Sequence, residues 1–77
     1  MARLPRVTAA RVIRVLVRLG FREVRQSGAH KLFRDATGKR VTVSCHAGEI
    51  LKPKTLKSIL GQAGLTVVEF DRILRNS

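Results

Sequence analysis

The fold is decided by the stretch FREVRQSGAHKLFRDATGKRVTVSC, residues 21–45. Its last part, residues 40–45, alternates between apolar and polar side chains. The apolar phase holds Val41, Val43 and Cys45, and the polar phase holds Thr42 and Ser44. A period of two residues is typical of a strand that buries one face and leaves the other open. This segment therefore predicts a half-buried strand.

Two turn signals divide the rest of the stretch. The pair Ser27-Gly28 separates an expected strand over residues 21–26 from a second over 29–34, and DATG at 35–38 separates the second strand from the third. Strands joined by turns this short pair antiparallel. We therefore expect a three-stranded antiparallel sheet.

The second strand has two candidates for its buried side, Leu32 and Phe33. We expect Phe33 to point into the core. Because alternate residues of a strand share a face, this places His30 and Arg34 together on the opposite face.

A helix is expected before the sheet, over residues 8–19. Thr8 suits a helix N-cap, and Gly20 suits the position after the C-terminus. The apolar residues recur at helical spacing, at Val12, Ile13, Leu16 and Leu19. The arginines share another face, at Arg11, Arg14 and Arg18.

Two helices are expected after the sheet. Pro53 suits the first position of a helix that Gly64 ends. Its apolar stripe consists of Leu56, Ile59, Leu60 and Ala63. Thr66 and Glu69 have the spacing of a capping box, which predicts a short terminal helix.

The order helix, three strands, helix, short helix predicts an α+β fold, a small two-layer sandwich with the helices on one face of the sheet. Double-stranded-RNA-binding domains have a similar order. With 77 residues, we expect a single domain over 1–77. The second face of the sheet, or its edge, is then available to a ligand.

Charge narrows the class of partner. Sixteen Lys and Arg residues stand against five Asp and Glu, a formal net charge of +11. Such an excess favours polyanions, with nucleic acid first, an acidic protein second and an anionic membrane surface third. A basic surface that is merely solvated is the remaining alternative. Several of the cations lie on or beside the expected sheet: Arg22, Arg25, Lys31, Arg34, Lys39 and Arg40.

The remaining composition favours a cytoplasmic protein without a bound metal or cofactor. Cys45 is the one cysteine, so no disulfide staples the fold, and no Cys and His cluster indicates a zinc site. No uncharged stretch approaches the roughly 20 residues of a membrane span. The basic N-terminus is not followed by the apolar segment of a secretory signal.

His30 is the residue best equipped for catalysis. It follows the first turn, with Arg25, Lys31 and Arg34 nearby in sequence or across the hairpin. RNA can be cleaved without metal when a base takes the proton of a ribose 2′-hydroxyl and cations stabilise the negative charge of the phosphorane. Neighbouring cations disfavour a charged imidazolium, which leaves the ring able to act as a base. A phosphate-binding or simply exposed histidine is the alternative.

Other residues are candidates for supporting roles. His46 follows the third strand and is either an auxiliary acid, a phosphate ligand or a hydrogen-bonding anchor of its loop. Arg14 and Arg18, with Arg25, Lys31 and Arg34, are candidates for contacts with RNA phosphates. The three phenylalanines are expected in the core rather than stacked on bases.

Successive blocks of the sequence resemble the HicA family of toxin mRNA endonucleases, over about residues 5 to 74. These blocks are LGF at 19–21, GAHKLFR at 28–34, GKRVTV at 38–43, HAGEILKP at 46–53, TLKSIL at 55–60 and QAGLT at 62–66. The family often has Ser where this chain has Ala29, and it usually has a Pro within the segment occupied here by Val43, Ser44 and Cys45.

The resemblance implies a double-stranded-RNA-binding-like fold, cleavage of mRNA and a HicB-type antitoxin that covers the active site. The family's catalytic histidine maps onto His30, and His46 matches a frequent family position. The leading hypothesis is therefore the toxin of a type II toxin–antitoxin system, a metal-independent endoribonuclease with His30 as general acid or base. The alternative is a noncatalytic RNA-binding module of the same fold.

Overall fold

The computed structural model describes residues 4–46 and 48–76 and confirms the α+β fold. Three strands form one antiparallel sheet in the order β1-β2-β3: β1 (Arg22–Ser27), β2 (His30–Arg34) and β3 (Arg40–Ser44). The first strand lies one residue later than expected. The turn is formed by Gly28 and Ala29 instead of Ser27 and Gly28, because Gly28 takes the left-handed backbone conformation, with φ of 58°.

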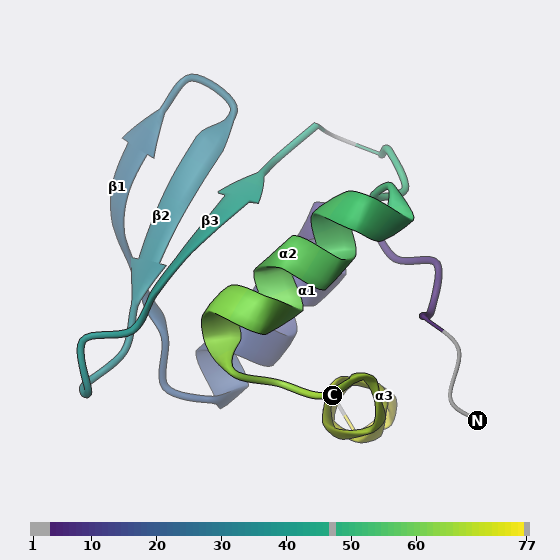
Figure 1. Ribbon diagram of the computed structural model, residues 1–77. Coiled ribbons are helices and arrows are strands. Elements are labelled where there is room, and N and C mark those ends of the chain that lie inside the picture. The colour runs from purple at the N-terminus through teal and green to yellow at the C-terminus, as the bar shows by residue number, and fades with distance from the viewer. Residues whose placement is uncertain (1–3, 47, 77) are drawn as a thin grey trace.

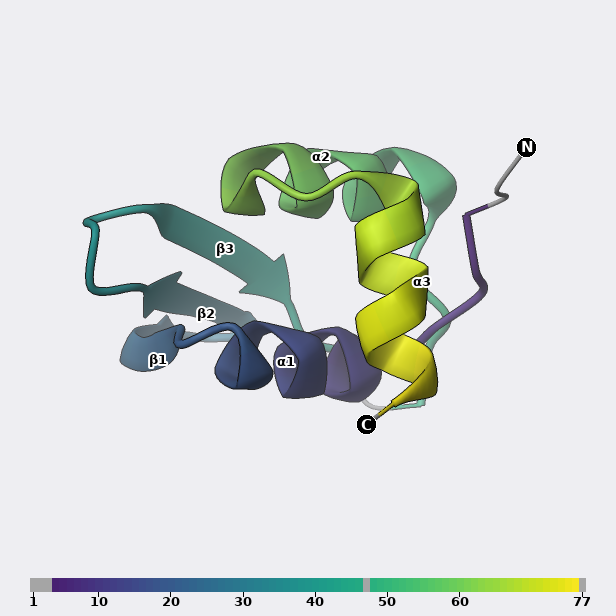
Figure 2. The ribbon, with the colours of Figure 1, turned by 90° about the horizontal axis from the view of Figure 1, so that it is seen from below.

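Three helices accompany the sheet: α1 (Ala9–Arg18), α2 (Pro53–Ala63) and α3 (Val67–Arg75). Helices α1 and α2 pack against one face of the sheet, and α3 lies beyond them, against α1 (Figures 1 and 2). Thr8 occupies the N-cap position of α1 as expected, but its side chain makes no capping hydrogen bond. The expected capping box of α3 is present, between Thr66 and Glu69.

One apolar core joins the helices to the sheet. The three phenylalanines all lie in it, with exposed fractions of 3% for Phe21, 1% for Phe33 and 0% for Phe70. Val41 and Val43 supply the buried phase of β3, as their alternation predicts. The other face of the sheet is not covered by α1 or α2, so the fold leaves it open (Figure 1).

Strand β1 shows no burial pattern, because all six of its residues are exposed. Its pairing with β2 shifts between Glu23 and Arg25, so that Val24 forms a bulge. This bulge accounts for the imperfect alternation of the sequence here. At the other side of the sheet, the backbone N–H of Thr42 donates to Oε1 of Gln62 on α2, at 3.0 Å.

The turn between β2 and β3 is organised by one carboxylate. Oδ1 of Asp35 accepts hydrogen bonds from the Thr37 hydroxyl at 2.7 Å, the Lys39 N–H at 2.8 Å and the Thr37 N–H at 3.0 Å. The Asp35 N–H donates to the Lys39 carbonyl at 3.1 Å. These bonds fix the register in which Arg34 pairs with Arg40.

The hydrogen bond from the Thr37 hydroxyl lowers the pKa of Asp35 from its ordinary value of 3.8. The hydrogen bonds from the N–H groups of Lys39 and Thr37 lower it further. A depressed native pKa stabilises the fold above the ordinary value, and this contribution is lost as the pH falls through the lowered pKa. We expect Asp35→Asn to flatten the acid limb of the stability profile, measured by urea unfolding at a series of pH values from neutrality downward. Glu49→Gln is the control, because the Glu49 carboxylate accepts no hydrogen bond within the described residues. An acid limb of unchanged steepness in Asp35→Asn would contradict this role.

The capping box generates a second prediction. The Thr66 hydroxyl accepts the Glu69 N–H at 3.1 Å, and the Glu69 carboxylate accepts the Thr66 N–H at 3.0 Å. Thr66→Ala should lower the free energy of unfolding by about 1 kcal/mol, whereas Thr66→Ser should retain most of it. Chemical denaturation of the two variants checks this, and equal stability of Thr66→Ala and wild type would refute it.

Candidate active site on the open sheet face

The strand register determines which side chains share the open sheet face. Directly paired residues of adjacent strands point to the same side. Because Phe33 is buried, residues 30, 32 and 34 of β2 point away from the helices. Their cross-strand partners complete three rungs of the open sheet face, namely Ser27–His30–Ser44, Arg25–Leu32–Thr42 and Arg22–Arg34–Arg40.

His30 lies at the first of these rungs, and its side chain is exposed. Its direct neighbours are two hydroxyl residues, exposed Ser27 and half-buried Ser44. The turn before it is tied to the end of β3 by a backbone hydrogen bond from the Cys45 N–H to the Ala29 carbonyl, at 2.6 Å. The backbone around His30 is thus fixed on both sides, while the imidazole is accessible to a ligand.

Two of the expected cations share this face with His30. Arg25 belongs to the adjacent rung, and Arg34 lies four residues farther along β2. Both are exposed. The expectation that Phe33 points inward and that His30 and Arg34 share the opposite face is confirmed.

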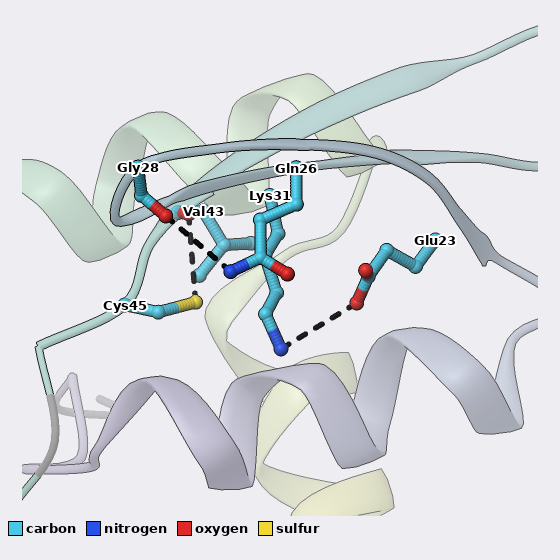
Figure 3. A network of polar contacts seen from close by, with 6 residues as sticks. All are labelled: Glu23, Gln26, Gly28, Lys31, Val43 and Cys45. Carbon is cyan, nitrogen blue, oxygen red and sulfur yellow. Dashed lines mark hydrogen bonds and ion pairs between the residues drawn. The ribbon is translucent and has the colours of Figure 1, made fainter.

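Lys31 lies on the other face of the sheet, although it is next to His30 in sequence. Its Nζ atom is 3.5 Å from a carboxylate oxygen of Glu23, and both side chains extend from the hairpin toward α1 (Figure 3). Adjacent residues of a strand point to opposite sides. The structure therefore separates Lys31 from the cations that accompany His30.

His46 and Lys31 line a cavity of about 380 Å³ between the start of α1 and the end of β3. Ile13, Ala9 and half-buried Cys45 contribute apolar surface to it, and the Cys45 thiol donates to the Val43 carbonyl at 3.6 Å. His30 does not line this cavity. His30 thus lies on the open sheet face, whereas His46 lies at the cavity beside α1.

Arg14 and Arg18 are exposed on α1, as the helical spacing predicts. Since α1 packs against the buried face of the sheet, these arginines do not share the open sheet face with His30. Within the described segments, no three His, Cys, Asp or Glu side chains come together as a metal site. None of the helices described is long and apolar enough to cross a membrane.

Sequence reasoning missed the hydroxyl neighbours of His30 and the alignment of Arg22 and Arg40 with Arg34. The sequence places Ser27 in a turn, and it presents Arg22 and Arg40 only as two of many cations near the sheet. Their relation depends on which residues face each other across the strands. The length of the Asp35 turn is the sequence signal that pairs Arg34 with Arg40, once the two strands are recognised.

Comparison with known proteins identifies a family for this chain. No curated protein sequence matches the chain significantly. A protein-family model described as "HicA toxin of bacterial toxin-antitoxin" matches residues 9–65, from the start of α1 to the residue after Gly64. The match includes the whole sheet with His30 and covers well over half of the 77-residue chain. The chain belongs to the HicA toxin family of bacterial toxin–antitoxin systems.

Proposed function

We propose that this HicA-family toxin is a metal-independent endoribonuclease that cleaves mRNA in the cytoplasm, with His30 as its general acid or base. The observation that carries the proposal is the placement of His30: an exposed imidazole on an open sheet face that also presents arginines. A HicB-type antitoxin is the proposed inhibitory partner, and it would act by covering this face. Family membership supports both the activity and the partner.

The proposed chemistry needs few groups. The imidazole of His30 takes the proton of a ribose 2′-hydroxyl, whose oxygen then forms a bond to the adjacent phosphorus. The bond from phosphorus to the 5′-oxygen breaks, and that oxygen takes a proton from the His30 imidazolium or from water. Arg25, on the adjacent rung, is suited to stabilise the negative charge that develops on the phosphoryl oxygens. The hydroxyls of Ser27 and Ser44 are suited to hydrogen-bond the ribose or the phosphate.

A cleavage assay in EDTA tests the proposal. His30→Ala should reduce cleavage of single-stranded RNA at least about 100-fold, the usual contribution of a positioned acid or base, while RNA affinity is retained. His46→Ala, assayed in parallel, tests the auxiliary role of the second histidine, which is also exposed but lines a different surface. Full activity of His30→Ala would refute the assignment. Binding without cleavage by the wild-type chain would favour the noncatalytic RNA-binding module.

The orientation of the cations gives a further expected outcome. Arg25→Gln should lower kcat/KM at least about tenfold, because it removes a charge from the face that carries His30. Lys31→Gln removes one charge from the opposite face and should have a much smaller effect. Steady-state kinetics of the two variants on one RNA substrate measures the difference. A larger loss in Lys31→Gln than in Arg25→Gln would place the substrate on the helix-covered side instead.

A further inference from the structure

Three arginines face one another across the sheet at the end opposite His30. Arg22 of β1 pairs with Arg34 of β2, and Arg34 pairs with Arg40 of β3. All three side chains are exposed on the open sheet face. Directly opposed residues have Cβ atoms roughly 5 Å apart, so the three arginine side chains start from neighbouring positions on one face. We call this set the arginine rung.

The arginine rung has no structural explanation within the protein. Like charges directly opposite one another destabilise a sheet. None of the three arginines forms an ion pair within residues 4–46 and 48–76. The nearest acids in sequence are otherwise engaged, since Glu23 pairs with Lys31 on the opposite face and Asp35 accepts hydrogen bonds within its own turn. The described residues thus supply no carboxylate to these three guanidinium groups.

We propose that the arginine rung is a phosphate anchor for the RNA strand whose scissile phosphate lies at His30. Arginine matches the geometry of a phosphate with two parallel hydrogen bonds, and several guanidinium groups together form a site for a strongly charged anion. The placement of the scissile phosphate at His30 rests on the proposed function. The binding of an RNA phosphate by the arginine rung does not depend on cleavage.

The placement of the arginine rung along β2 favours a linear polyanion. Arg34 lies four residues from His30 on the same face, roughly 13 Å at 3.3 Å per residue. Half-buried Leu32 lies between them and offers apolar surface to a base or a ribose. A single RNA strand that runs along β2 would meet the catalytic histidine at one end of the sheet and the anchor at the other. An acidic segment of a protein is the competing occupant, and the experiment separates the two.

The test compares two variants that each lose three positive charges. R22Q/R34Q/R40Q removes the arginine rung, and K57Q/R72Q/R75Q removes three exposed cations from α2 and α3. Binding of a fluorescent single-stranded RNA is measured by anisotropy over a range of salt concentrations. Removal of three phosphate contacts should reduce the slope of log Kd against log salt by about 2, at 0.7 per contact for single strands. The control variant should retain the wild-type slope.

Two further readouts separate an anchor from a structural role. In cleavage assays R22Q/R34Q/R40Q should raise KM while kcat stays near wild type, because His30 is untouched. At low salt the same variant should unfold at the same or a higher temperature than wild type, since the mutual repulsion is relieved.

The outcomes are distinguishable. An unchanged salt slope, or an equal loss in both triple variants, would overturn the anchor. Unchanged RNA binding together with weakened binding of the HicB-type antitoxin would assign the arginine rung to an acidic protein and likewise overturn it. If wild type binds RNA with the expected difference in slope but cleaves nothing, the anchor stands and the proposed catalytic function fails.

Discussion

Phe33 is the one buried residue of β2, opposite Glu23 and Val41, with 1% of its surface exposed. Because side chains alternate along a strand, the burial of the Phe33 ring determines on which side of the sheet each of the remaining β2 side chains lies. A slip of one residue would bury Arg34 and expose the ring, at a cost of several kcal/mol. The accessibility of His30 is therefore a consequence of core packing, three residues away.

The sequence predicted most strongly those parts of the fold that bury apolar side chains. The alternation of Val41 and Val43 predicts β3, and the capping pair Thr66 and Glu69 predicts α3. Strand β1 was placed one residue early, because a fully exposed strand has no burial pattern to define its ends. The bulge at Val24 obscured its alternation further.

The candidate site was predicted less completely than the fold. His30 could be singled out because few residues of this chain titrate near neutral pH. Proximity in sequence selects both Arg34 and Lys31 as its cationic neighbours, but only Arg34 shares the open sheet face with His30, and Lys31 lies on the other face. The arginine rung depends on register in both hairpins at once. If either turn is placed one residue off, Arg22, Arg34 and Arg40 no longer face one another. The sequence alone therefore does not predict the arginine rung.

The two edges of the sheet differ in a way that bears on self-association. On β3, the outward N–H of Thr42 donates to Gln62 of α2, whereas no strand among residues 4–46 and 48–76 pairs with the outer side of β1. If two copies paired through β1, each would present only its β3 edge, where α2 already packs, to the next molecule. One outward N–H of that edge is already bonded to Gln62, so the β3 edge is a poorer template for strand pairing than the β1 edge. The formal net charge of +11 also opposes the close approach of two copies of this chain.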